Sequence, residues 1–224
     1  AGGYLVPMGF AAELVKSMKM WGPMLDPGVT RELVTSAGNT IPFPTTNDTA
    51  NTGALVAENT DVSTSTDITF GQKTLNAYKY GHLIQVSREM IDDSGVDLLG
   101  FLARQAGISI GVAVNTALTT GTDTTQPNGI AVAAGSGVTG GTGVVGAFTA
   151  DNLIDLSYSV NSAYRRMPGT GWMMATSALA ATRKLKDTYG QYLFQPSLQA
   201  GQPDQLLGYA IYENPDVAAV GTAN

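Results

Sequence analysis

The residues best suited to chemistry gather in the stretch YKYGHLIQVSREMIDDSG, which runs from Tyr78 to Gly95. It contains His82, the only histidine of the chain, together with Glu89 and the adjacent Asp92 and Asp93. A histidine near carboxylates can act as a general acid or base, and grouped carboxylates can bind a cation. General-base catalysis also requires a positioned partner and a pocket, and the chain has no second histidine and no cysteine to complete a metal site.

The spacing of these groups favours a structural role. Adjacent residues on a helix point apart, and acidic residues near the start of a helix are explained by the helix dipole. The spacing of a calcium-binding loop is absent. His82 falls on the expected buried face of a predicted strand, so we interpret it as structural. We therefore expect no catalytic residues, no metal site and no cofactor.

A second candidate site is the motif Gly135-Ser-Gly137-Val-Thr-Gly140, a formal match to the G-x-G-x-x-G of dinucleotide-binding folds. In those folds a helix begins within the motif and its N-terminus approaches the pyrophosphate. Here the helical pattern begins only near Ala150, after three further glycines. We interpret the motif as a glycine-rich loop, and a nicotinamide-dependent enzyme is kept as an alternative from a different functional class.

The composition indicates a protein whose surface is covered by neighbours. Only 13% of the 224 residues are charged, against about 25% in typical soluble domains, while 43% are hydrophobic. The net charge of −6 argues against tight binding to a nucleic-acid backbone. The sequence has no uninterrupted apolar run of about 18 residues, so we expect no membrane span. Because the chain starts at Ala1, we expect that an upstream segment has been removed.

Hydrophobic periodicity predicts an α+β fold. Helices are expected over 10–21, 97–119, 150–165 and 177–186, and strands over 70–86, 172–175, 191–194 and 206–213. A short helix capped by Ser87 should precede the long one, which is apolar around most of its circumference and so predicts a buried spine. The segment from Glu32 to Gln72 has no Lys or Arg and is rich in Thr, Asn, Ser and Gly, which predicts a long projecting hairpin.

Several blocks, read in order, resemble the major capsid proteins of tailed bacteriophages, which have the Hong Kong 97 type fold. The most specific are QVSREMIDDS at 85–94 and YLFQPSLQAGQPDQLLGYAIYEN at 192–214. The resemblance implies an N-terminal arm over 1–35, an extended loop over 36–76, part of a peripheral domain with a spine helix over 77–120, and an axial domain over 121–224. Family members usually continue past the element that ends at Glu213 with strands that return to the peripheral domain, so we expect this sequence to be a fragment or to omit its tail.

The implied function is structural. Copies of the chain would form pentamers and hexamers and assemble, in the cytoplasm of a bacterial host, into an icosahedral phage or prophage head enclosing double-stranded DNA. Further partners implied are a scaffold or maturation protease, a portal, decoration proteins and loosely held DNA, with no membrane. An encapsulin, a nanocompartment shell protein of the same fold, is the nearest alternative.

The same resemblance suggests candidate subunit-interface residues in the extended loop, at the start of the spine region and in the axial domain. These are Leu55, Glu58, Asn59, Asp61, Arg88, Glu89, Arg165 and Arg166. Some family members join the extended loop to a neighbour through a lysine isopeptide bond. Because residues 58–61 contain no lysine, we expect shells of this protein to be stable without that cross-link.

Overall fold

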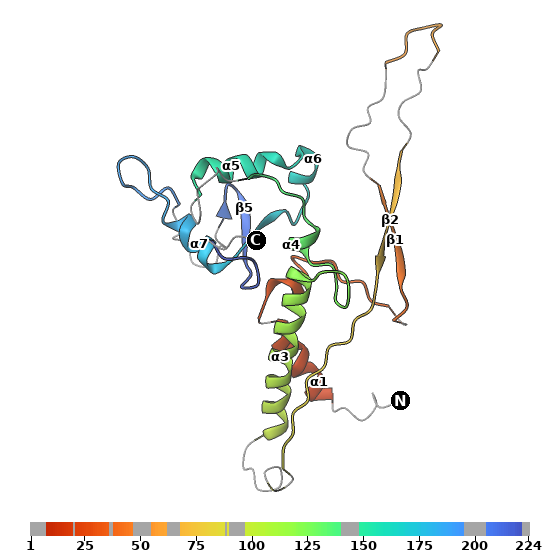
Figure 1. Ribbon diagram of the computed structural model, residues 1–224, viewed down its shortest axis with the longest axis vertical. Coiled ribbons are helices and arrows are strands. Elements are labelled where there is room, and N and C mark those ends of the chain that lie inside the picture. Colours follow the sequence, from red (N-terminus) through yellow and green to blue (C-terminus); the bar gives the residue numbers. More distant parts are fainter. Residues whose placement is uncertain are drawn as a thin grey trace. The chain divides into compact units, whose positions relative to one another are not determined.

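The computed structural model describes residues 8–19, 21–35, 38–46, 55–61, 68–87, 89, 97–139, 148–194 and 205–220. The chain divides into two units. One unit is Leu33–Lys79, and the other combines Ala1–Glu32 with Tyr80–Asn224. Figure 1 shows the chain as a ribbon and labels most of its helices and strands.

The smaller unit contains a two-stranded antiparallel sheet. Strand β1 (Ile41–Thr46) pairs with β2 (Phe70–Leu75), with Ile41 opposite Leu75 and Thr46 opposite Phe70 (Figure 1). Where the pairing ends, the Thr40 hydroxyl donates a hydrogen bond of 3.0 Å to Oδ1 of Asn76. Nearly every residue of both strands is exposed within this unit. A two-stranded ribbon of this kind is marginally stable without a partner surface.

Two prolines shape one edge of this ribbon. Pro42 and Pro44 alternate along β1, so their missing N–H groups lie on the same side of the strand. The residues next to the prolines make the backbone hydrogen bonds to β2. The two positions without an N–H group therefore lie on the outer edge of β1. The outer edge of β1 therefore offers few donors for another strand.

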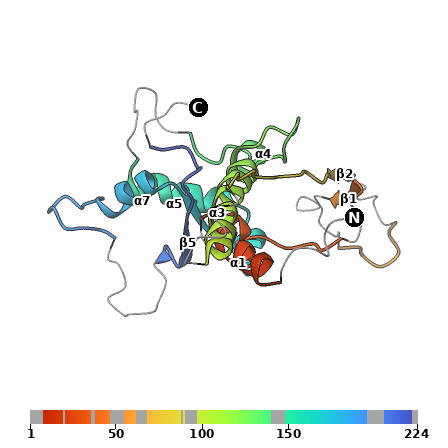
Figure 2. The ribbon, with the colours of Figure 1, turned by 90° about the horizontal axis from the view of Figure 1, so that it is seen from below.

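In the larger unit, helix α1 (Met8–Lys19) packs along helix α3 (Leu98–Thr120), as Figures 1 and 2 show. A Cβ added at Gly107 would lie 2.9 Å from Cβ of Ser17, and one at Gly111 would lie 2.6 Å from the Met18 carbonyl oxygen. The two glycines thus allow the backbones to approach closely. An ion pair of 3.2 Å between Arg104 and Glu13 extends the contact.

A buried polar cluster joins three separate segments at the C-terminal half of α3. Asn115 donates to Oδ1 of Asn214 at 2.9 Å and to the carboxylate of Asp216, and accepts from the backbone N–H of Met24 at 3.4 Å. Asn214 in turn donates to the Thr119 hydroxyl at 2.9 Å. Asn115, Thr119 and Asn214 are at most 1% exposed. We call Asn115, Thr119, Asn214 and Asp216 the polar hub.

The C-terminal module comprises residues 148–220 and combines a small sheet with short helices. Its sheet has the order β3-β5-β4, with β5 parallel to β3 and antiparallel to β4. The elements are α5 (Ala150–Ser159), α6 (Ser162–Arg165), β3 (Gly171–Met174), α7 (Thr176–Arg183), β4 (Gln205–Leu206) and β5 (Tyr209–Glu213). The remaining described elements are the 3₁₀ helix η2 (Pro23–Leu25) and α4 (Ile130–Ala133), a single turn that follows α3.

Local signals explain where the longer helices begin. The Asp97 side chain accepts from the N–H of Gly100 at 3.0 Å and caps α3. Thr149 and Asn152 form a reciprocal capping box at the start of α5. The expected helix over 97–119 and the start of the expected helix at 150 are therefore confirmed. The short helix expected after Ser87 lies largely outside the described residues.

Four predictions of secondary structure were wrong, because in each case the predicted helix or strand is interrupted or ends early. The predicted helix over 150–165 breaks at Val160, which is extended, and Asn161 caps the new helix α6. The strand expected over 70–86 ends at Leu75, since β1 begins opposite it. The strand expected over 206–213 is two strands separated by a turn at Leu207 and Gly208, both with positive φ. Residues 191–194 form only a single bridge, between Lys186 and Tyr192.

Two burial predictions also need correction. His82 is exposed, although Tyr78, Ile84 and Val86 are half-buried. Helix α3 is not buried all round, because Leu99 and Phe101 are 56% and 59% exposed. By length and composition alone α3 could also cross a membrane. Its glycine face against α1 and its share of the polar hub are instead typical of a helix inside a folded domain.

Candidate subunit interface

The described residues bury few large side chains and expose many. Seven hydrophobic residues are buried, and four of these are alanines, whereas 27 large hydrophobic residues are exposed. Single exposed apolar residues are ordinary, but so many beside so small a core indicate surfaces that become covered by something else. The largest exposures include Leu55 at 102%, Tyr189 at 90%, Val34 at 85% and Phe70 at 77%.

The predicted interface residues of the extended loop are accessible. Leu55 is fully exposed, and Glu58, Asn59 and Asp61 are exposed beside it. Their backbone is ordered by a turn in which the N–H of Thr60 donates to the Ala57 carbonyl at 3.3 Å. Asn59 has a φ of 64°, a left-handed conformation that asparagine tolerates in turns. The turn thus exposes polar side chains next to the fully exposed Leu55.

The other predicted interface residues lie in the larger unit. Glu89 is exposed, and Arg88 lies outside the described residues. Arg166 is exposed, whereas Arg165 is half-buried, with its guanidinium carbon 4.4 Å from the centroid of the Tyr158 ring. The described members of the predicted set therefore belong to two separate units, and their role at an interface stays a prediction. Those at 55–61 belong to the unit Leu33–Lys79, and Arg165 and Arg166 to the other unit.

The stretch from Tyr78 to Gly95 shows no catalytic arrangement in its described part. His82 is exposed and no described residue donates to or accepts from it, while residues 90–96 lie outside the description. Across the described residues, no group of three or more His, Cys, Asp or Glu side chains could hold a metal ion. Gly135 and Gly137 lie in irregular backbone, and no helix begins within the described part of the glycine motif.

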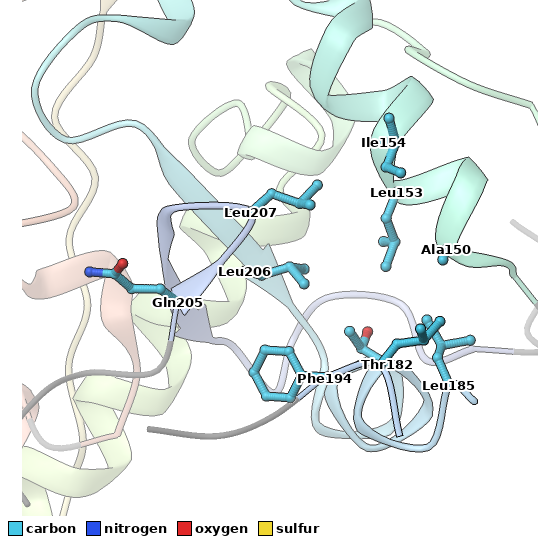
Figure 3. A pocket seen from close by; sticks show the side chains of 10 residues that line it. Ala150, Leu153, Ile154, Thr182, Leu185, Phe194, Gln205, Leu206 and Leu207 are labelled. Carbon is cyan, nitrogen blue, oxygen red and sulfur yellow. The ribbon is translucent and has the colours of Figure 1, made fainter. Parts of the chain in front are cut away.

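One cavity of about 410 Å³ lies in the C-terminal module. Figure 3 shows Leu153 of α5 and Leu206 of β4 facing the same space, with Phe194 and Leu185 lining it further round. None of the lining residues is titratable. A mostly apolar cavity without convergent polar groups lacks the nucleophile, base or charged group that an active site needs. We interpret it as a packing space between α5 and the sheet.

Two structural features were not predicted from the sequence. The polar hub links Asn115 to Asn214, 99 positions away, and a polar asparagine inside an apolar helix was the one available signal. The exposed Tyr189 follows Asp187, and the sequence Asp-Thr-Tyr-Gly was a turn signal that could have marked it. Neither feature has a counterpart among catalytic motifs.

Known proteins share this fold. The capsid of a native GTA particle has a TM-score of 0.68 with this structure at 23% identity, and the match covers 98% of this chain and 76% of that one. The capsid of an empty GTA particle also has a TM-score of 0.68, at 22% identity, covering 86% of this chain and 68% of that one. A structure from Mycobacterium phage Cain has a TM-score of 0.52 at 21% identity, covering 81% and 60% respectively. No curated protein matches the chain.

At these identities the structural matches show the fold. The family match is broader, because the phage capsid family matches residues 2–224, nearly the whole chain. The expected α+β fold of Hong Kong 97 type is thus confirmed. The abundance of exposed apolar side chains in the described residues agrees with a structural role. The chain therefore belongs to the phage capsid family, as a structural major capsid protein of the virion.

Proposed function

We propose that copies of this chain form pentamers and hexamers that close into an icosahedral shell around double-stranded DNA, without catalysis. The observation that supports this most directly is the exposed apolar surface: in the described residues 27 large hydrophobic side chains are exposed, whereas the seven buried hydrophobic residues include four alanines. Many modest interfaces repeated around a closed shell add up, since each further contact is made at high effective concentration. A net charge of −6 keeps contact with DNA loose.

The division of labour within the subunit follows from the resemblance. We propose that residues 1–35 act as an arm, 36–76 as an extended loop reaching a neighbour, 77–120 as part of the peripheral domain and 121–224 as the axial domain. The separate unit Leu33–Lys79 supports an independent loop, because a two-stranded ribbon gains stability from a partner surface. A scaffold or maturation protease, a portal and decoration proteins are proposed partners, with assembly in the host cytoplasm.

The proposal is tested by placing a charge on the extended loop. Leu55 is 102% exposed, so Leu55→Asp removes no contact within the subunit and should leave the thermal unfolding midpoint unchanged. If the loop docks on a neighbour, the buried carboxylate should reduce shell formation strongly, because desolvating an unpaired charge is unfavourable. Sedimentation and negative-stain microscopy measure the shells.

The matched control is Thr125→Asp, which adds the same charge at another exposed position. It should assemble like the parent chain. Parent chains that never form particles would refute the proposed function, and normal shells from Leu55→Asp would refute the role of the loop.

A further inference from the structure

The turn after α7 holds one aromatic side chain out into solvent. The Asp187 carboxylate accepts from the N–H groups of Tyr189 and Gln191, both at 2.9 Å, and the Asp187 N–H donates to the Gln191 carbonyl at 2.9 Å. Gly190 has a φ of 82°, which completes a tight turn. Tyr189 at its tip is 90% exposed. We call residues 187–191 the Tyr189 turn; its backbone is ordered before any partner binds, so little entropy is lost on docking.

At another place in the C-terminal module lies a pocket of about 260 Å³ between the ends of α5 and α6 and the sheet. We call it the Arg165 pocket; its lining consists of Leu156, Ser157, Val160, Arg165, Thr170, Gly171, Trp172, Met173 and Tyr209. Arg165 is the only charged residue among them. Its Nε is buried and has no hydrogen-bond partner in the described structure. A buried unpaired donor is unfavourable and rare, so this N–H calls for an acceptor.

The size and lining of the pocket restrict what fits. Its volume is below the range of about 300–1,000 Å³ usual for small-molecule sites and suits a single large side chain. Apolar walls and an unpaired N–H match a tyrosine, which offers a ring to the walls and a hydroxyl oxygen to Nε. Arg165 already lies over the Tyr158 ring, so its guanidinium favours aromatic neighbours.

The charges around the two features favour a second copy of this chain as the partner. Asp151 and Asp155 are exposed on α5, the helix that forms one wall of the Arg165 pocket, and neither makes an ion pair in the described part of the chain. Lys184 precedes the Tyr189 turn and is exposed, whereas the ammonium of Lys186 lies 4.8 Å from the Tyr192 ring. Asp155, next to the pocket residue Leu156, and Lys184 carry opposite charges and would attract one another between copies.

The positions of the two features set the kind of contact. Figures 1 and 2 show the loop that follows α7 projecting from one end of the C-terminal module, and Figure 1 shows α6 at the opposite end. A turn at one end and a pocket at the other produce a head-to-tail contact, which closes into a ring when the rotation between copies allows. We propose that Tyr189 of one subunit inserts into the Arg165 pocket of the next subunit around each ring; this deepens, and rests on, the proposed function.

Cysteine cross-linking tests the contact, because the chain contains no cysteine of its own. In the double variant Thr188→Cys with Val160→Cys, one thiol flanks Tyr189 and the other lines the pocket, and Tyr189 itself is retained. Oxidation of assembled particles should give a ladder of covalent oligomers on non-reducing denaturing gels. The control variant, Thr125→Cys with Val160→Cys, should give no ladder.

Substitutions of Tyr189 in the cross-linking background show whether the ring itself makes the contact. Tyr189→Ala should reduce the cross-linked fraction about tenfold or more, as expected for a buried aromatic anchor, and Tyr189→Phe, which keeps the ring but removes the acceptor for the Arg165 Nε, should reduce it less. Particles without a ladder, or a ladder unaffected by Tyr189→Ala, overturn this contact but leave the proposed function intact. Absence of particles from the cysteine-free parent overturns the proposed function and this contact with it.

Discussion

Replacing Asn115 by leucine is the most direct test of the polar hub. Leucine has the same number of non-hydrogen side-chain atoms but neither donates nor accepts, so Asn115→Leu removes the hydrogen bonds to Asn214 and Asp216 and the acceptor for the Met24 N–H. The side chain is 1% exposed, and water cannot easily replace these bonds. The substitution therefore removes the hydrogen bonds while keeping the branched arrangement of the side chain.

The expected loss of stability depends on the polar groups that Asn115→Leu leaves without a partner. The Asn214 oxygen still accepts from the Asp216 N–H at 3.1 Å, and the half-buried Asp216 carboxylate can turn toward water. The Met24 N–H, in a residue 7% exposed, loses its acceptor, and a buried group left unpaired costs about 1–3 kcal/mol. Adding the lost charge-assisted bond to Asp216, worth about 1.5–3 kcal/mol, gives a decrease of about 2.5–6 kcal/mol in the free energy of unfolding. For a chain of this length the midpoint should fall by about 5–24 °C.

Urea unfolding followed by far-UV circular dichroism measures the free energy. Asn115→Asp should lower it further than Asn115→Leu, because the second carboxylate would face Asp216 and the Asn214 oxygen. Thr116→Ala is the matched control, since its exposed hydroxyl donates only to the Val112 carbonyl of its own helix, and it should change stability by no more than about 0.5 kcal/mol. An Asn115→Leu protein as stable as the parent would show that the hub contributes no net stability.

Three further substitutions test the local contacts of α3 and α5. Gly107→Ala and Gly111→Ala should each lower the free energy of unfolding by about 1–3 kcal/mol, because the new methyl group meets the α1 backbone or Ser17. Gly81→Ala, whose Cβ would meet nothing within 4 Å, is the matched control, and equal stabilities in all three variants would contradict the close helix contact. Thr149→Val keeps the shape but removes the capping hydroxyl and should cost about 1 kcal/mol in thermal unfolding, whereas Thr125→Val should cost little; equal values would discount the cap.

The sequence predicted those parts of the fold that have local causes. The long helix follows from its apolar pattern and the cap at Asp97, and α5 starts where Thr149 indicated. The paired strands β1 and β2 agree with the expected hairpin, although its reach over a neighbour stays a proposal. Family resemblance, rather than periodicity, supplied the shell-forming role.

Features that depend on residues far apart in the sequence, or on surfaces elsewhere in the subunit, could not be predicted from local patterns. Whether the helix over 150–165 continued depended on Asn161 capping a second helix rather than staying in the first. The exposure of Leu99 and Phe101 depends on which surfaces the rest of the subunit leaves open, and no periodicity records that. The polar hub requires Asn115 and Asn214 to meet in space.

The prolines of β1 have a consequence for the time between synthesis and assembly. A capsid protein is made in many copies, and each free ribbon could template strand pairing with another and start an irregular aggregate. Pro42 and Pro44 remove donors from the outer edge of β1, and Lys73 places a charge on β2. Strand addition is thereby disfavoured, while the exposed side chains of the ribbon stay free for a neighbour. The ribbon can therefore avoid aggregation before assembly and still be available for a contact in the finished shell.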